Sequence, residues 1–437
     1  MSRRQRTRIF QALGLGALVV SLAAPAAAAT EAQTKRASVS SSGAQVAAQS
    51  AQPMISGNGR FIAFWSEADD LVPGDSNGVE DAFVHDRRTG HTSRVNVRSN
   101  GRQANGGSDE ISISASGRYV AFESEADNLV KNDTNGIQDV FVHDRATGKT
   151  RRVSIRGNGA QANGRSRDPA ISADGRYVAF ESAAGNLVKG DTNGRQDIFV
   201  HDRATGKTRR VSVRSNGAQG NDGSQDPTIS ADGRYVAFES DASDLVKGDT
   251  NGAQDIFVHD RATGKTRRMS VRSSGAQVKS RSRNAAISAN GRYVAFESAA
   301  PQLVKGDANA ANDIFVHDRA SGKTRRVSLR SNGAEGNAGS RDPSISADGR
   351  YVAFESDASD LVKGDTNVAQ DVFIHDRATG KTRRVSVRSN GVQGDAGSAH
   401  ASVSADGRLV AFQSVAGNLV WDDTNAVRDV FVRGPLR

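Results

Sequence analysis

The sequence of 437 residues contains no cysteine, which excludes disulfide bonds, thiolate metal ligands and a cysteine nucleophile. Aromatic residues make up only 5% and hydrophobic residues 36% of the chain, which is little for one large core. After residue 29, no apolar run approaches the roughly 20 residues that a membrane-spanning helix needs. The sequence therefore predicts no membrane span, and it predicts stability from thin, regular packing layers.

The first 29 residues have the pattern of a secretory signal peptide. Four arginines lie among the first eight residues, a mostly apolar stretch runs from Ile9 to Val20, and small residues follow from Ala23 to Ala29. Cleavage would remove these four arginines and no acid, which lowers the net charge from +9 to +5. We expect residues 1–29 to be a signal peptide, residues 30–35 a short flexible lead and residues 36–437 the folded domain of a secreted or periplasmic protein.

An internal repeat dominates the rest of the chain. A Gly-Arg pair recurs every 58 residues without insertion or deletion, with the arginine at Arg60, Arg118, Arg176, Arg234, Arg292, Arg350 and Arg408. A fixed period of this length is typical of propellers and other repeat architectures. The seven steps cover nearly all of the chain beyond the signal peptide, so a second domain is not expected.

One repeat contains four short β-rich runs, which in the third unit are 170–172, 177–182, 197–202 and 208–214. Asp174-Gly175 and Thr205-Gly206 supply tight turns, because glycine accepts positive φ freely. A long polar loop separates the second run from the third. No apolar pattern at helical spacing is present, so the pattern indicates a blade of four antiparallel strands.

The two ends of the chain predict how the array closes. The seventh unit stops at Val432, after its third strand, whereas Arg36 to Ser40 falls in the fourth-strand column. We therefore predict an all-β, seven-bladed β-propeller of 58-residue, four-stranded blades, in which the N-terminal strand completes the last blade. Trp65 and Trp421 interrupt regular columns near this seam, and we expect them to pack there rather than to form exposed platforms.

The repeated segments S-A-D-G-R-Y-V-A-F and D-I-F-V-H-D-R-A-T-G resemble the TolB-like, WD40-like β-propeller repeat of bacteria. The resemblance covers nearly the whole chain beyond the signal peptide, and it implies the propeller fold. The sequence departs from the family pattern at Ala173, Ala231 and Ala347, where the family favours proline.

A D-x-N-x-x-x-D motif occurs in the long loop of every unit. Its members are Asp75, Asn77, Asp81, Asp133, Asn135, Asp139, Asp191, Asn193, Asp197, Asp249, Asn251, Asp255, Asp307, Asn309, Asp313, Asp365, Asn367, Asp371, Asp423, Asn425 and Asp429. Oxygen ligands at such spacing suit Ca²⁺, so seven structural calcium sites are one hypothesis. The alternative is that Asp and Asn cap their own turn through hydrogen bonds to the backbone.

Six units carry a His-Asp pair on the third strand, with histidines at His85, His143, His201, His259, His317 and His375. The seventh unit places Arg433 there without breaking the repeat. We interpret the histidines as structural groups between packed blades rather than as catalytic residues. The resemblance to WD-type blades implies the same, because those blades use a buried histidine in a structural hydrogen-bond network.

Basic residues gather in the fourth strands, as at Arg209, Arg210 and Arg214. These strands lie at the blade edges, where charge prevents pairing with other chains. The basic residues are expected to spread evenly round the rim and have no interleaved aromatics, so we predict no nucleic-acid partner.

The repeats differ most just before the first strand, which should line the axis. One column reads Gln52, Glu110, Asp168, Asp226, Asn284, Asp342 and His400, and its neighbour reads Ala51, Asp109, Arg167, Gln225, Arg283, Arg341 and Ala399. Polar side chains that converge on a channel mouth form a plausible ligand site. The alternative is drift in a solvated loop. Our candidate ligand-binding residues are Glu110, Arg167, Asp168, Asp226, Arg283, Asn284, Arg341, Asp342 and His400.

Two functions remain open at this point. The first is an exported, monomeric and non-enzymatic binding or scaffold propeller that recognises a protein, peptide or glycan at its long-loop face. The second is a lyase or hydrolase acting on polysaccharide at the channel mouth. No G-x-S-x-G or H-E-x-x-H motif is present, and the near-identity of the units leaves little room for one specialised site. We therefore assign no catalytic residue and favour binding.

Overall fold

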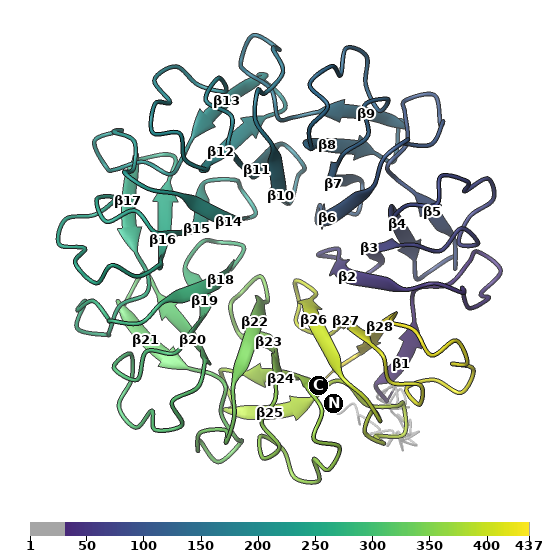
Figure 1. Ribbon diagram of the computed structural model, residues 1–437. Helices are drawn as coiled ribbons and strands as arrows, with labels where there is room; N and C mark the ends of the chain where they lie inside the picture. The colour runs from purple at the N-terminus through teal and green to yellow at the C-terminus, as the bar shows by residue number, and fades with distance from the viewer. Residues whose placement is uncertain (1–30, 437) are drawn as a thin grey trace, which may run out of the picture. The chain divides into compact units, whose positions relative to one another are not determined.

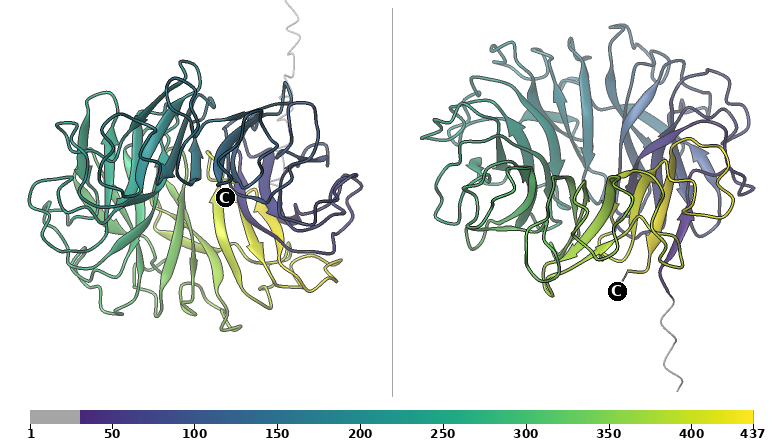
Figure 2. Two further views of the ribbon diagram at one scale, coloured as in Figure 1. Left: turned by 45° about the horizontal axis from the view of Figure 1, so that its top comes forward. Right: turned by 60° about the horizontal axis from the view of Figure 1, so that its bottom comes forward.

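The computed structural model describes residues 31–436. In this part of the chain, 28 strands form seven four-stranded antiparallel sheets, arranged as blades around a central channel (Figure 1, Figure 2). The predicted all-β, seven-bladed propeller is confirmed. Within residues 31–436, no helix has the length and hydrophobicity needed to cross a bilayer.

Each blade consists of an inner strand, two middle strands and an outer strand. The inner strands are β2 (Ser50–Ile55), β6 (Ser108–Ile113), β10 (Ser166–Ile171), β14 (Ser224–Ile229), β18 (Ser282–Ile287), β22 (Ser340–Ile345) and β26 (Ser398–Val403). The second strands are β3 (Phe61–Ser66), β7 (Tyr119–Ser124), β11 (Tyr177–Ser182), β15 (Tyr235–Ser240), β19 (Tyr293–Ser298), β23 (Tyr351–Ser356) and β27 (Val410–Ser414).

The third strands are β4 (Asp81–Asp86), β8 (Asp139–Asp144), β12 (Asp197–Asp202), β16 (Asp255–Asp260), β20 (Asp313–Asp318), β24 (Asp371–Asp376) and β28 (Asp429–Gly434). The outer strands are β5 (Thr92–Arg94), β9 (Lys149–Arg152), β13 (Lys207–Arg210), β17 (Lys265–Arg268), β21 (Lys323–Arg326), β25 (Lys381–Arg384) and β1 (Gln33–Arg36). We number the blades 1 to 7 from β2–β5 to β26–β28, with β1 as the outer strand of blade 7.

The second and third strands lie at the predicted residues, whereas the inner strand (Ser166–Ile171, predicted 170–172) and the outer strand (Lys207–Arg210, predicted 208–214) have other bounds. The inner strand β10 begins at Ser166 instead of Ala170, because a β-bulge lets the chain pair with β11 on both sides of Pro169. The outer strand β13 ends at Arg210 instead of Arg214. Beyond it, Val213 forms only an isolated bridge with Gln219.

Packing between neighbouring blades supplies the core. Phe180 of β11 and Phe199 of β12 are fully buried, and their rings stack with centroids 6.0 Å apart. They share one apolar cluster with Ala121 and Val142 of the preceding blade. Thin layers of this kind explain why a chain with few aromatic residues can form a stable core.

The N-terminal strand closes the ring, as predicted. In Figure 1 the purple β1 lies beside the yellow β28, and Arg36 pairs with Phe431 in an antiparallel register. The Ser38 hydroxyl donates a 2.6 Å hydrogen bond to Asp429. Residues 33–35, expected to be a flexible lead, therefore belong to blade 7. The predicted signal peptide, residues 1–29, lies outside the described residues.

The two tryptophans near the seam differ from each other. Trp65 packs against the core between blades 1 and 2, so it is packed as expected but lies one blade junction away from the expected seam. Trp421 is 86% exposed, and the Arg388 guanidinium covers one face of its ring at 3.6 Å from the centroid. The expectation that Trp421 packs in the seam is therefore wrong, because most of its side chain is exposed to solvent.

Candidate functional site

Seven variable residues form a ring around the channel, which we call the axial ring. Its members are Gln52, Glu110, Asp168, Asp226, Asn284, Asp342 and His400, and all have positive φ, between 37° and 53°. They lie inside the inner strands, at the β-bulge, and not in the loop before the strand as expected. A backbone with positive φ is strained for residues other than glycine, and such strain is typical of functional sites.

A cavity of about 370 Å³ lies at the level of the axial ring, and all seven ring residues line it. The channel continues along the inner strands into a second section of about 470 Å³. There, Ile113, Ile171 and Ile287 contribute an apolar wall. We call this section of the channel, with Ile113, Ile171 and Ile287, the apolar sleeve. The site thus combines a polar ring with a neighbouring apolar surface, which is a typical composition of ligand pockets.

A row of buried glutamates holds the axial ring in place. Glu123 on β7 accepts a 2.7 Å hydrogen bond from the backbone N–H of Asp168 in the next blade. Equivalent bonds join Asp226 to Glu181 at 3.1 Å, Asp342 to Glu297 at 3.1 Å, His400 to Glu355 at 2.9 Å, and Asn284 to Glu239. Sequence reasoning missed this row. The signal was a charged residue that recurs inside the apolar strand Y-V-A-F-E-S.

The convergence of carboxyl groups perturbs their protonation. Burial raises the pKa of Glu123, and the neighbouring Asp109 raises it further. Burial also raises the pKa of Asp168, with added repulsion from Glu181 and Glu110. The pKa values of Glu110, Asp226, Glu239 and Glu355 are raised with burial as the main cause. The channel mouth therefore favours protons or other cations.

Three predicted arginines sit beside this acidic ring, and they neutralise only part of it. Arg167 donates to Glu181 and Arg283 donates to Glu297 in the same way. Arg341 pairs with the exposed Asp357. These guanidinium groups are about two-fifths exposed, so their pairs are screened by solvent.

Blade 1 breaks the ring's symmetry. Trp65 stands where five other blades have the buried glutamate, and its indole N–H donates a 2.8 Å hydrogen bond to Gln52. Gln52 in turn donates a 2.8 Å hydrogen bond to Glu110. One side of the channel mouth is therefore neutral and aromatic, and the opposite side is acidic.

Within residues 31–436, two groups of carboxylates are placed so that they could hold a metal: Asp168 and Asp226 of the axial ring with Glu181 of the glutamate row, and Asp307, Asp313 and Glu335 at an Asp/Asn loop. Each residue offers one carboxylate oxygen, and within a group these oxygens lie within 4.8 Å of one another. Carboxylate oxygens suit Mn²⁺, Mg²⁺ or Ca²⁺.

In each Asp/Asn loop the two aspartates of the D-x-N-x-x-x-D motif lie close to each other, as the motif predicted, and both contact the guanidinium group of one arginine. In blade 3, Arg210 lies 3.2 Å from Asp191 and 3.0 Å from Asp197. The Asn193 side chain accepts a 3.0 Å hydrogen bond from the Arg195 N–H, which is an Asx turn. An arginine takes the same position in all seven blades: Arg36, Arg94, Arg152, Arg210, Arg268, Arg326 and Arg384. A calcium ion would have to share the carboxylates with this guanidinium.

The third-strand histidines lie in a hydrogen-bond network between blades. His201 Nδ1 is 2.9 Å from the Thr208 hydroxyl, which donates to the carbonyl of Ile155 in the preceding blade. Burial lowers the pKa of His201 to about 4, so its imidazole is neutral. In blade 7, Arg433 donates to Thr34 at 2.8 Å and replaces the histidine in this network. These contacts fit the structural interpretation.

A scan against protein-family models and a search of curated proteins give no match. Among solved structures, the chain is similar to an oligogalacturonate lyase in complex with manganese, with 13% identity and a TM-score of 0.55 over 93% of this chain and 96% of that protein. It is also similar to the β-propeller domain of the Trilobed protease from Pyrococcus furiosus, with 12% identity and a TM-score of 0.53 over 88% and 93% of the two chains.

TolB from Acinetobacter baumannii matches with 16% identity and a TM-score of 0.42, over 75% of this chain and 66% of TolB. Similar structures thus include TolB and other propellers, as the repeat motifs predicted. At these identities the likeness shows the fold alone. Fold and site together define a seven-bladed β-propeller with an acidic axial channel.

Proposed function

We propose that this protein is a non-enzymatic binding module whose ligand is a cationic segment of a protein or peptide held at the axial ring. The observation that carries the proposal is the excess of carboxyl groups there. Four of the seven ring positions are acidic, and the glutamate row behind them adds buried carboxyl groups with raised pKa. A lysine or arginine side chain would relieve this repulsion.

The apolar sleeve supports the same ligand class. Lysine and arginine carry aliphatic stems that pack on apolar surface while the charged head meets a carboxylate. Ile113, Ile171 and Ile287 offer such a surface next to the ring. The strained bulge fixes the acidic side chains before the ligand arrives, which limits the ordering cost of binding.

The test uses hexalysine as the probe and Asp168→Asn with Asp226→Asn as the variant. Asparagine already occupies this column at Asn284, so the backbone should tolerate it. We expect a loss of affinity of about tenfold or more, with an unchanged melting temperature. The matched control is Asp174→Asn with Asp232→Asn at the tight turns of the other face, where Asn290 already occurs. Equal affinity for both double variants would contradict the proposal.

A second candidate function is that of a metal-assisted enzyme acting on a polysaccharide. It is favoured by the converging oxygens of Asp168, Glu181 and Asp226, and by the likeness in fold to a lyase in complex with manganese. In that case these three residues would hold the metal, which would supply a Lewis acid. Incubation with polygalacturonate and Mn²⁺ should then release unsaturated products that Asp226→Asn no longer releases. Absence of products at all metal concentrations would speak for the binding module.

We also propose that the protein is exported, on the basis of the basic and apolar segments within residues 1–29. N-terminal sequencing of the protein recovered outside the cytoplasm should then start close to residue 30. A start at residue 1 would contradict export by cleavage of a signal peptide.

A further inference from the structure

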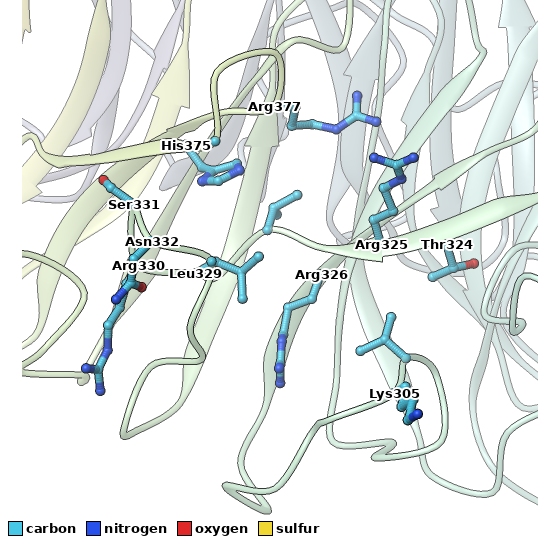
Figure 3. A pocket seen from close by; sticks show the side chains of 14 residues that line it. Lys305, Thr324, Arg325, Arg326, Leu329, Arg330, Ser331, Asn332, His375 and Arg377 are labelled. Atoms are coloured by element: carbon cyan, nitrogen blue, oxygen red, sulfur yellow. The ribbon is translucent and has the colours of Figure 1, made fainter.

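A groove on the outer edge, between blades 5 and 6, is lined by basic and neutral residues. Its volume is about 640 Å³, and Lys305, Arg325, Arg330 and Arg377 are among the residues that line it. No aspartate or glutamate lies among the lining residues. Figure 3 shows the Arg325 and Arg377 side chains extending toward the same part of the groove.

Two of these cations have no partner of opposite charge within residues 31–436. Lys305 and Arg325 are exposed and form no ion pair or side-chain hydrogen bond in that range. Arg377 is held in place, because it donates to the carbonyl of Gly349 and covers the Tyr293 ring at 4.5 Å from the centroid. Burial lowers the pKa of Arg377, Tyr293 and Asp318 raise it, and repulsion from the adjacent Arg325 lowers it. An anion in the groove would relieve this repulsion.

The same set of three cations recurs at the equivalent positions between four consecutive pairs of blades. The sets are Lys131 with Arg151 and Arg203, Lys189 with Arg209 and Arg261, Lys247 with Arg267 and Arg319, and Lys305 with Arg325 and Arg377. In every set burial is the main cause that lowers the pKa of the third member. A tyrosine and an aspartate raise this pKa, and the outer-strand arginine lowers it, so the third members share the same electrostatic surroundings.

The series ends at the seam of the ring. In the groove between blades 1 and 2, Pro73 and Ser93 replace the first two cations, and between blades 6 and 7 Pro435 replaces the third. The complete sets thus form an arc, which we call the basic arc, along β9, β13, β17 and β21 on the outer edge (Figure 1), whereas the basic residues of the outer strands themselves continue on β25. If these cations served only to prevent the outer strands from pairing with other chains, every blade would need the same set.

We propose that the basic arc binds a linear acidic polysaccharide whose carboxylates enter successive grooves. A polymer fits because the same site repeats along the edge. Once one part of the polysaccharide is bound, its other carboxylates are held at a high effective concentration near the remaining sites, so several weak contacts together give a high affinity. Guanidinium groups pair with carboxylates through two parallel hydrogen bonds.

A single-stranded nucleic acid fits less well, because it needs free aromatic faces for its bases. Arg292 and Arg377 both lie over the ring of Tyr293, and paired arginines cover Tyr119, Tyr177 and Tyr235 in the same manner. The aromatic rings along the arc are therefore occupied.

The experiment measures the binding of alginate to the intact propeller. The arc variant replaces Arg151, Arg209, Arg267 and Arg325 with serine, the residue that blade 1 carries as Ser93. The control variant replaces four exposed arginines outside the sets, Arg88, Arg102, Arg165 and Arg408, with serine. Both variants lose the same charge. We expect the arc variant to lose at least about tenfold in affinity and the control to stay within about twofold, with binding that weakens as salt rises.

Three outcomes would overturn the proposal: no binding of alginate by the unmodified protein, equal losses in both variants, or tighter binding of poly-dT that the arc variant abolishes. Neutral dextran should not bind. The variant with Asp168→Asn and Asp226→Asn should retain alginate binding, so the axial ring and the basic arc can be tested separately.

Discussion

The backbone N–H of Asp168 donates a 2.7 Å hydrogen bond to Oε2 of Glu123 in the preceding blade. Glu123 thus determines both the position of a neighbouring ring residue and the charge around it. Because this bond joins blades 2 and 3, the acidic ring and the contact between blades depend on the same side chain. Changes to the glutamate row should therefore alter the pH dependence of stability as well as ligand binding.

The first prediction concerns that pH dependence. The pKa of Glu123 is higher in the folded protein than in the unfolded chain, mainly through burial, so the folded state binds more protons. Its stabilising contribution is complete below the ordinary pKa of about 4 and is lost as pH rises through the raised value. We expect the melting temperature to fall from about pH 7 to about pH 9, and Glu123→Gln to reduce this fall.

Glutamine already serves in this column as Gln413, which accepts a 2.9 Å hydrogen bond from the N–H of Gln52. The control is Glu125→Gln on the exposed loop that follows, which should leave the pH profile unchanged. The buried histidines act in the opposite sense below about pH 6.5, so the comparison is made above that value. Parallel profiles for wild type and Glu123→Gln would disprove the prediction.

The second prediction concerns ring closure. A chain that starts at Gly43 lacks β1 and the Ser38 bond to Asp429. We expect its melting temperature to fall by about 10 °C or more, since β28 then has an open edge, and we expect dimers or larger species in gel filtration. A chain that starts at Ala32 keeps the whole strand and should melt like the full protein. A monomer with an unchanged melting temperature after removal of β1 would show that the strand does not close the ring.

The third prediction compares two glycines with similar backbone angles. Gly175 has a φ of 74°, and a Cβ there would lie 2.0 Å from the ring of Tyr119. Gly206 has a φ of 69° and open space around it. Urea unfolding should show a loss of about 1 kcal/mol for Gly206→Ala, from backbone strain. Gly175→Ala should lose about 3 kcal/mol, because the tyrosine must also move. Similar losses would mean that the turn does not pack as described.

The fourth prediction concerns an exception among the Asp/Asn loops. Glu335 stands where the other blades carry a glutamine that donates to the loop aspartate, as Gln393 does to Asp365 at 2.8 Å. Asp307 has no such glutamine donor, and its Oδ2 is buried without a hydrogen-bond partner. Glu335→Gln should raise the free energy of unfolding by about 1 kcal/mol, and Gln393→Glu should lower it by a similar amount. A loss of stability in Glu335→Gln or a gain in Gln393→Glu, measured by urea unfolding, would contradict this explanation.

The fifth prediction addresses calcium. Because Arg210 contacts both Asp191 and Asp197, the two carboxylates already have a counter-ion, and EDTA or calcium should leave the melting temperature of the wild type unchanged. Arg210→Ala leaves Asp197 buried without that cation and should cost about 3 kcal/mol. Added Ca²⁺ should then restore part of the loss. A wild-type melting temperature that rises with calcium would support calcium sites in the unmodified loops.

The sequence alone determined the number of blades, the order of strands and the closure by the N-terminal strand. These features depend on periodicity and turn chemistry, which are local, and on the position of Arg36 one period before Arg94. It also identified the variable column from Gln52 to His400, although it placed that column in a loop.

Only the tertiary structure showed that this column lies in a strained bulge, that a glutamate row joins it to the next blade, and that an arginine contacts both carboxylates of each Asp/Asn loop. The physical reason is distance along the chain. Asp168 and Asp226 lie one full repeat apart, and the contacts among the ring residues exist only after seven sheets have closed on one axis.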